Sequence, residues 1–158
     1  MKANRNNLRA CILDRLVDLE PGVSHEPVQS SFQGMGQIKA SLVRDIESLL
    51  NTKRQIIVPP SGYRELNNSL FVYGLRDFTA QNPRSPSTRQ QLRQDIEKTI
   101  SRFEPRLRNL TVQLDTTNQN DRNFRFHITG VLVVEPIREP VSFDTYFDVN
   151  RCEYRVSL

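Results

Sequence analysis

The sequence lacks the features of a membrane-spanning or exported protein. Its 158 residues include no apolar run of about 18, so no helix is expected to cross a bilayer. The basic N-terminus is followed by a segment that Asp14, Arg15 and Asp18 interrupt, whereas a signal peptide needs an unbroken apolar stretch there. We therefore expect neither export nor direct membrane insertion.

Cysteine is also scarce. Only Cys11 and Cys152 are present, near opposite ends of the chain. Two such thiols are free in a reducing cytoplasm or bridged in an oxidising compartment. Because no export signal precedes them, the sequence favours free, buried thiols.

Little in the sequence would hold a phosphate, a metal or a nucleophile. The six glycines are scattered, and Gly34-Met35-Gly36 precedes a helical pattern without the rest of a phosphate-binding loop. Neither His25, in a polar segment, nor His127, on the outward face of a strand, has a ligand at metal-binding spacing. Neither lies beside a nucleophile in the sequence, although a triad could still assemble in space. We expect no cofactor and no metal.

Residues 1–35 are predicted to be an N-terminal helix and a polar tether. Apolar side chains recur at spacings of three and four over residues 8–19, which indicates a short amphipathic helix, and Pro21-Gly22 ends the pattern. Residues 22–36 are polar and indicate a loop, so the first helix is expected to dock separately from a single domain over 36–158. The apolar positions are Leu8, Cys11, Ile12, Leu16 and Leu19.

Two longer helices are predicted within residues 36–158. One covers about 36–51, and the other begins at Ser87 or Thr88, each followed by glutamine at the capping-box spacing. Pro105 ends the second helix near residue 103, because its ring removes a donor and clashes with the preceding turn. The buried positions are Ile38, Leu42, Ile46 and Leu49 in the first helix, and Leu92, Ile96, Ile100 and Phe103 in the second.

After Pro105 the apolar period changes to two, which is typical of strands. Helices followed by a meander predict an α+β domain with the helices on one face of an antiparallel sheet. Gly130 indicates a bulge or a close approach, and the last strand is expected at or near an edge, where backbone groups can pair with a partner strand. The strand positions are Leu110, Val112, Leu114, then Phe124, Phe126, Ile128, Leu132, Val134, then Val141, Phe143, Phe147, Val149, then 152–156 after a turn at Asn150-Arg151.

Positive charge is concentrated in one segment. The chain carries a net charge of +4, and residues 84–108 are rich in arginine. This segment is either a solvated helix face or a docking surface for an acidic protein partner. Nucleic acid is disfavoured as a partner because zinc-finger spacing, an RNP-type aromatic pair and a glycine-rich loop are all missing.

The segment Phe103 to Leu107 joins the last helix to the first strand. Glu104 and Arg106 flank Pro105 there, so two opposite charges are held on a stiff corner. The corner either braces the fold, with Glu104 paired to a cation such as Arg106 or Arg102, or binds another protein. A catalytic carboxylate pair is not indicated elsewhere: Asp144 and Asp148 would lie about 13 Å apart on one strand, and glycosidases need roughly 5–9.5 Å.

Five ordered segments together resemble a known family. They are Leu13-Asp14-Arg15-Leu16, Leu49 to Arg54, Tyr73 to Phe78, Phe103 to Leu107, and Pro140 to Thr145. Over about residues 8–156 the chain resembles the TssE-type baseplate protein of bacterial type VI secretion, which is similar to the gene-25-product wedge protein of contractile phage tails. One departure is Arg76, where the resemblance leads us to expect proline.

The resemblance implies a structural role and no catalysis. It implies a wedge component that sits with TssF, TssG and TssK on the cytoplasmic side of the bacterial inner membrane and provides the platform for contractile sheath assembly. Its sheet resembles the interlocking strand module of sheath subunits. Glu104, Pro105 and Arg106 are implied as partner-binding residues that hold the wedge core together. The alternatives are a lysozyme-like muramidase with Glu104 as general acid and a nucleic-acid-binding domain that uses the basic 84–108 face.

Overall fold

The computed structural model of the protein describes residues 8–9, 11–17, 21–22, 24, 32–78, 81–82, 85–115, 124–148 and 151–158. Within these ranges, helices dominate the N-terminal part and strands the C-terminal part. The elements in chain order are β1 (Leu8–Arg9), α1 (Ile12–Leu16), β2 (Phe32–Gln33), α2 (Met35–Asn51), α3 (Arg64–Asn67), the 3-10 helix η1 (Leu70–Val72), α4 (Pro86–Phe103), β3 (Leu107–Leu114), β4 (Phe124–Val134), β5 (Ile137–Asp148) and β6 (Glu153–Ser157).

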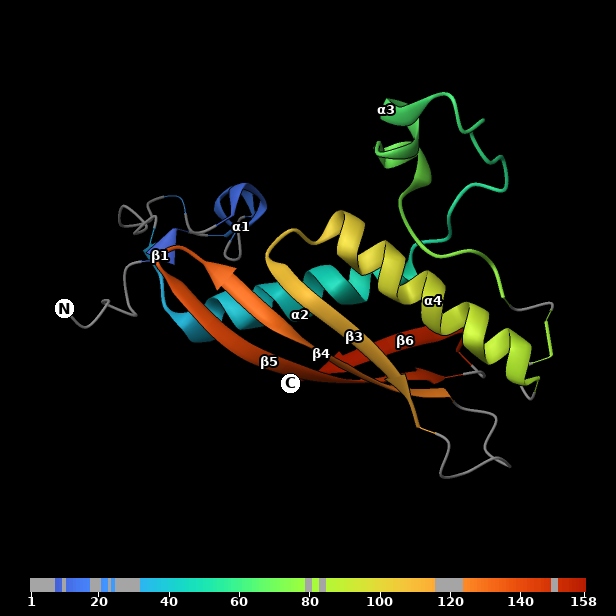
Figure 1. Ribbon diagram of the computed structural model, residues 1–158. Coiled ribbons are helices and arrows are strands. Elements are labelled where there is room, and N and C mark those ends of the chain that lie inside the picture. The colour runs from blue at the N-terminus through green and yellow to red at the C-terminus, as the bar shows by residue number, and fades with distance from the viewer. Residues whose placement is uncertain are drawn as a thin grey trace.

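The sheet is an antiparallel meander in the order β3-β4-β5-β6. Helices α2 and α4 lie side by side on one face of it, with α4 along β3 and α2 along β6 (Figure 1). The predicted α+β class, with helices on one face of an antiparallel sheet, is confirmed. So is the prediction that the last strand lies at an edge.

The core lies between the two helices and the sheet. Cross-strand neighbours Val112, Ile128 and Phe143 form one buried row. The helix positions predicted from the 3.6-residue period are buried as expected, apart from Phe103, which is partly buried. The apolar stripes are therefore the main tie between the layers, since burying each such side chain is worth about 1.5–3 kcal/mol. They comprise Ile38, Leu42, Ile46 and Leu49 of α2 and Leu92, Ile96 and Ile100 of α4.

The start of α4 differs from the sequence prediction. The helix begins at Pro86 with Ser85 as its N-cap residue, whereas Ser87 or Thr88 was predicted. Proline suits the first helical position because its missing N–H would have no partner there, and its fixed φ matches the helix. The predicted start of the helix is therefore too late in the sequence.

The N-terminal prediction of one amphipathic helix over 8–19 is wrong. Leu8 lies in β1, pairs with Gln33 of β2 and is only 1% exposed, in the main core. The helix α1 has five residues, and its apolar side chains Ile12 and Leu16 are 73% and 76% exposed. A helix this short cannot stabilise itself, and the strand pairing of Leu8 takes the first apolar position out of the helical pattern.

Gly130 is a close approach, and the bulge lies in the facing strand. The β3–β4 register shifts between Arg108 and Thr111, where Asn109 has φ of 52°. A Cβ on Gly130 would lie 3.3 Å from the carbonyl oxygen of Arg108, so the bulged strand crowds this position. The predicted strand position Val149 and the predicted turn position Asn150 lie outside the described residues.

The structure corrects the prediction for the cysteines. Cys11 and Cys152 are not joined in a disulfide, as expected, but Cys11 is only partly buried and Cys152 is exposed, so the prediction of buried thiols is wrong. Cys152 lies at the turn before β6 with φ of 53°. None of the helices that the structure describes is long and apolar enough to cross a membrane.

Residues 55–73, here called the protrusion, stand away from the helices and the sheet (Figure 1), except at Tyr73, whose ring lies against Phe103 of α4. Their base is fixed by two backbone hydrogen bonds, from Leu75 N to Thr52 O at 2.9 Å and from Arg54 N to Leu75 O at 2.7 Å. Gly74, with φ of 96°, closes this base, and a Cβ there would overlap the carbonyl oxygen of Thr52. The protrusion also contains the short helix α3.

Candidate functional site

The charged corner begins where α4 ends. Glu104 is the C-cap residue, and its N–H donates to the Ile100 carbonyl at 2.8 Å. Pro105 follows and cannot continue a helix, and the Leu107 N–H turns back to the Glu104 carbonyl at 3.1 Å. The chain thereby enters β3 directly, and the Glu104 side chain is carried into the domain with only 6% exposure of the residue.

Glu104 and Arg106 are paired with each other. Arg106 Nε donates to Glu104 Oε1 at 2.8 Å, and Arg106 Nη2 donates to Oε2 at 2.7 Å, a bidentate arrangement. The Arg106 backbone N–H also donates to Oε1 at 3.2 Å. Such charge-assisted pairs are stronger than neutral hydrogen bonds. Of the two cations that the sequence offered to Glu104, the structure selects Arg106.

The pair is joined to α2. Arg106 Nη2 also donates to Asp45 Oδ2 at 2.7 Å, and Nη1 donates to Ser41 Oγ at 3.3 Å. The hydrogen bonds that Arg106 donates to Glu104 outweigh the opposing effect of burial and, helped by Asp45, raise the pKa of the Arg106 guanidinium above its usual range. These contacts tie the end of α4 and the start of β3 to the middle of α2, so the corner braces the fold.

A second charged cluster attaches α1 beside the corner. Arg44 donates to Asp14 Oδ1 at 2.7 Å and to Asp45 Oδ1 at 2.8 Å, and the Cys11 thiol donates to Asp14 Oδ2 at 2.9 Å. Desolvation would raise the pKa of Asp14, but the hydrogen bonds from Cys11 and Arg44 outweigh it and lower that pKa. Burial and the bond to Asp14 raise the pKa of the Cys11 thiol.

An open hollow lies between α1 and the corner. Its walls include Leu13 and Val17 on one side and Pro105 on the other, with part of α2 as its floor. Tyr73 and Phe103 border it with ring centroids 5.1 Å apart in an edge-to-face arrangement. Within the described residues, the hollow brings exposed apolar groups next to the charged corner, which no single stretch of sequence indicated.

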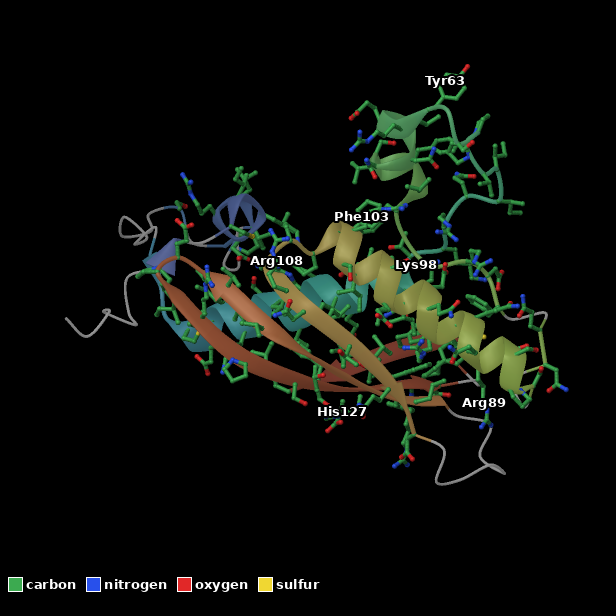
Figure 2. All side chains as sticks on the ribbon, viewed as in Figure 1. Tyr63, Arg89, Lys98, Phe103, Arg108 and His127 are labelled. Atoms are coloured by element: carbon green, nitrogen blue, oxygen red, sulfur yellow. The ribbon has the colours of Figure 1, made fainter. Side chains whose placement is uncertain are left out.

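Ion pairs within the protein neutralise part of the positive charge of residues 84–108. Arg93 pairs with Glu97 at 2.9 Å, and Arg106 pairs with Glu104 and Asp45. Asp95, the buried acid of this segment, accepts instead from Arg54 and Arg76 of the preceding loops. Lys98, Arg89 and Arg108 are spread over different parts of the surface (Figure 2). This dispersal favours a solvated helix face over one compact basic patch.

Arg76 has a role that proline could not perform. Its backbone N–H donates to Asp95 Oδ2 at 3.2 Å, and its guanidinium lies 3.3 Å from Asp95 Oδ1 and 5.3 Å from the ring of Phe78. Proline has no N–H and no charge. The departure from the expected proline therefore replaces a rigid loop residue with one that attaches the loop to α4.

A Ser-His-Asp array does assemble in space, on the sheet face opposite the helices. Strand pairing sets His127 opposite Asp144, with His127 Nδ1 2.8 Å from Asp144 Oδ1 and His127 Nε2 3.0 Å from Ser142 Oγ. The side chains of His127 and Asp144 are 46% and 79% exposed. The spacing is that of a catalytic triad, but such chemistry relies on preorganised donors in a water-excluded site.

No group of three or more metal-ligating side chains is assembled among the residues that the structure describes. At the corner, both side-chain oxygens of Glu104 accept hydrogen bonds from Arg106. The partners Ser41 and Asp45 were missed from the sequence. They lie more than 60 positions from Arg106, and only the contact of α2 with the corner brings them there.

The fold and the braced corner define a small α+β module in which two helices cover one face of an antiparallel sheet. The family model of baseplate wedge protein gp25 matches residues 36–137, which include α2, the protrusion, α4, the corner and the first two strands of the sheet. The chain therefore belongs to the gp25 baseplate wedge family, whose members are structural components of a baseplate.

Among solved structures, the chain is similar to a chain of "The baseplate complex from the type VI secretion system". The identity is 18%, the TM-score is 0.48, and the match covers 70% of this chain and 94% of that one. A comparison with curated proteins gave no match.

Proposed function

We propose that the chain is a TssE-type wedge protein of a type VI secretion baseplate. The family match over residues 36–137 carries this proposal, and the five segments that resemble the TssE type support its finer part. In this role the protein binds TssF, TssG and TssK at the cytoplasmic face of the inner membrane and offers a platform to the contractile sheath. It needs no small-molecule substrate.

Glu104, Pro105 and Arg106 are proposed as partner-binding residues within a corner that also braces the domain. Arg106 has five N–H donors, and its bonds to Glu104, Asp45 and Ser41 use four of them. Pro105 is exposed and borders the hollow. A wedge protein would therefore contact the corner through the Pro105 ring and the hollow, while the ion pairs hold that surface in shape.

The experiment that tests the function is co-purification from the native bacterium. Tagged wild type is expected to recover wedge and sheath proteins. Leu13→Asp places a charge in the wall of the hollow at a 53% exposed position, so it should lose those partners while the domain stays folded. Gln113→Glu, exposed on the helix-free face of β3, is the matched charge control and should recover them. Recovery of no baseplate protein by wild type would contradict the proposal.

Strand addition by a sheath subunit is proposed at β3 and not at β6. The outward side of β6 is already occupied, because Asn51 accepts from Tyr154 N at 2.7 Å and donates to Tyr154 O at 2.9 Å, and Glu47 accepts from Val156 N at 3.2 Å. On β3, Asp115 N bonds to β4 while the Val112 carbonyl faces Arg93 of α4. By the alternation of an antiparallel ladder, Leu114 also points its backbone groups outward.

Leu114→Pro tests this edge. It removes one outward N–H without removing a bond to β4, and proline is tolerated on edge strands. Leu114→Ala is the control for the lost side chain. We expect both variants to recover wedge proteins and only Leu114→Ala to recover sheath subunits. Equal sheath recovery by the two variants would place the contact elsewhere.

Hydrolysis is a second candidate function because Ser142, His127 and Asp144 have triad spacing. We infer that the array is a surface hydrogen-bond network, since water competes for these exposed groups and screens their charges. Turnover of p-nitrophenyl acetate is expected to be the same for wild type and Ser142→Ala. A burst of product that Ser142→Ala abolishes would establish an acyl-enzyme instead. Release of reducing sugar from peptidoglycan, abolished by Glu104→Gln, would likewise establish the muramidase alternative.

A further inference from the structure

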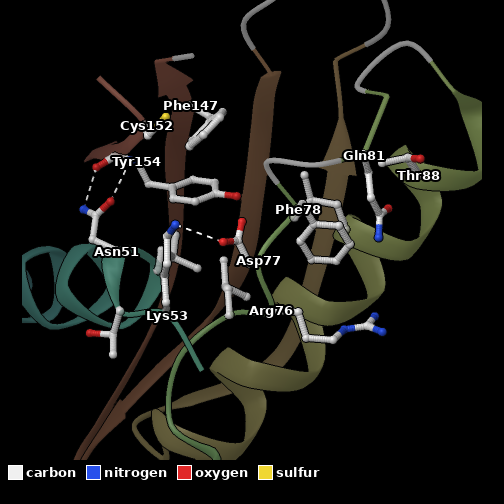
Figure 3. Close-up of a pocket in the computed structure, with 14 residues that line it drawn as sticks. Asn51, Lys53, Arg76, Asp77, Phe78, Gln81, Thr88, Phe147, Cys152 and Tyr154 are labelled. Atoms are coloured by element: carbon white, nitrogen blue, oxygen red, sulfur yellow. Dashed lines mark hydrogen bonds and ion pairs between the residues drawn. The ribbon is translucent and has the colours of Figure 1, made fainter. Parts of the chain in front are cut away.

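A small pocket lies at the other end of α4 from the corner, about 24 Å away along the helix axis. It is lined by the end of α2, residues 75–78, the start of α4, the end of β5 and the start of β6 (Figure 3). Its volume is about 150 Å³. Its apolar lining is contributed by Leu50, Leu75, Leu92, Phe78 and Phe147.

The size of this end pocket restricts its occupant. An apolar cavity of about 150 Å³ stays dry and accepts a single benzene-sized ring. Three of the lining leucines, Leu50, Leu75 and Leu92, are 3% exposed or less, so the floor is part of the hydrophobic core. The pocket is thus preformed by the fold and fits one ring rather than an extended ligand.

One buried polar group gives the pocket a chemical preference. Tyr154 is 8% exposed, lines the pocket, and is fixed by the two backbone bonds to Asn51. Among the described residues, none forms a hydrogen bond with its hydroxyl. Burial, assisted by the charge of Asp95, raises the pKa of Tyr154, so the phenol stays neutral and can donate. A ligand oxygen in the pocket can therefore accept a hydrogen bond from the Tyr154 hydroxyl.

Charged groups lie only at the rim. Lys53 and Asp77 form an ion pair of 3.0 Å, and their side chains are 65% and 46% exposed. The guanidinium of Arg76 lies over the ring of Phe78 and holds that wall. The pocket has apolar walls, one polar atom and a pair of opposite charges at its mouth. This combination suits a side chain of a polypeptide, because the N–H and C=O groups of its backbone can interact with Asp77 and Lys53 at the rim.

We propose that the end pocket binds one aromatic side chain of a protein partner, tyrosine in preference to phenylalanine, as a second contact site distant from the corner. This inference rests on the proposed function, because the assembly supplies the partner. Aromatic anchors seated in small pockets dominate many protein interfaces. The Tyr154 hydroxyl donates to the incoming phenol oxygen, and the apolar walls enclose its ring.

Small-molecule probes test the chemistry of the pocket on the full chain. We expect p-cresol to bind saturably, more tightly than toluene, with NMR shifts of the methyl groups of Leu50, Leu75 and Leu92. Tyr154→Phe should remove the preference for p-cresol while toluene still binds. Tyr146→Phe, on the exposed face of β5, should retain the preference. Absence of saturable binding, or equal affinities in wild type, would overturn the inference.

The exposed thiol of Cys152 allows the pocket to be filled covalently. In Cys11→Ser it is the only thiol, and benzyl methanethiosulfonate converts it to a benzyl disulfide as the thiolate attacks sulfur and methanesulfinate leaves. The methyl reagent is the matched control. We expect the benzyl label to abolish p-cresol binding and to reduce recovery of wedge proteins about tenfold, and the methyl label to do neither.

The two measurements separate the two ideas. Wedge recovery that is equal for both labels would overturn the aromatic anchor even if p-cresol binds. Failure of the unlabelled chain to recover any baseplate protein would overturn the proposed function instead, and the p-cresol titration would still decide whether the pocket accepts a ring.

Discussion

The corner at Glu104 to Arg106 and the protrusion at residues 55–73 use their side chains in opposite ways. The corner carries charge, yet its charges are turned inward, with Glu104 6% exposed and bonded to Arg106. The protrusion carries apolar groups and turns them outward: Ile56, Ile57 and Val58 are 94%, 71% and 78% exposed. Of the two roles that the sequence leaves open for the corner, its internal ion pairs show the bracing role, and the protrusion presents a run of exposed apolar side chains.

The difference follows from what each segment can reach. The corner lies against α2, so its arginine finds Asp45 and Ser41. The protrusion is attached to the domain through the short bridge at Lys53 and Leu75, and its own helices are too short to form a core. Soluble monomers rarely expose contiguous apolar surface unless it is an interface. The exposed apolar run of the protrusion is therefore a surface whose role in assembly can be tested beside that of the corner.

Removing Arg106 should have the largest effect, because it breaks the brace. Arg106→Ala leaves Glu104 buried without its cation, and such a loss typically costs a few kcal/mol. We expect about 3 kcal/mol, seen as a melting temperature lower by roughly 6–12 °C for a chain of this size. Calorimetry of the purified domain measures it.

Arg108→Ala is the matched control for that experiment. Arg108 is an exposed residue of the same β3 strand, so its loss should change the free energy of unfolding by no more than about 0.5 kcal/mol. If both variants have the melting temperature of the wild type, the corner does not brace the fold, and the contrast with the protrusion disappears.

The sequence predicted the regular parts well, for a physical reason. Helix α2 and the strands bury one face each, so their apolar positions recur at a fixed period, as Leu42 and Ile46 do. The same logic failed for residues 8–19, because Leu8 is buried by strand pairing and not by a helix. Periodicity cannot distinguish these causes within so short a segment.

The candidate site was predictable only where it is local. The pairing of Glu104 with Arg106 spans two residues and follows from the turn at Pro105. The hydrogen bond from Arg106 to Asp45 depends instead on how α2 packs against the corner. The contact of Ser142 and Asp144 with His127 needs the exact strand register. Neither the bond of Arg106 to Asp45 nor the contacts of His127 can be predicted from neighbouring residues in the sequence.

Gly74→Ala should have the next largest effect, because it strains the base of the protrusion. The residue has φ of 96°, and an added Cβ would overlap Thr52. We expect about 2 kcal/mol of destabilisation, since such backbone positions cost of order 1–3 kcal/mol for other residues. Gly62→Ala, within the protrusion and with open space around it, should be near neutral. Equal melting of the two variants would show that the base is not a fixed hinge.

Acidification should release α1 before it affects the core. The folded-state pKa of Asp14 is lowered from 3.8, so its contribution is complete above about pH 4–5 and is lost as pH falls through the lowered pKa. We expect an effect under about 1 kcal/mol, because the Arg44 partner is exposed. Amide exchange of Arg15 and Val17 against pH measures it, and Asp14→Asn should remove the dependence. The same pH dependence of amide exchange in wild type and Asp14→Asn would contradict the role of Asp14.

Changing the protrusion itself should barely alter stability, which makes it the sharpest test of the comparison. Ile57→Ser replaces a 71% exposed apolar side chain and should shift the free energy of unfolding by no more than about 0.5 kcal/mol. If a wedge protein covers this surface, the same variant should reduce wedge recovery strongly, while Gln55→Ser, an exposed polar neighbour, should not. A variant that is stable yet unassembled is the reverse of Arg106→Ala, whose assembly defect would follow from lost stability. Full recovery by Ile57→Ser would mean that the apolar surface stays open in the assembly, and the hollow beside the corner would then be the main contact.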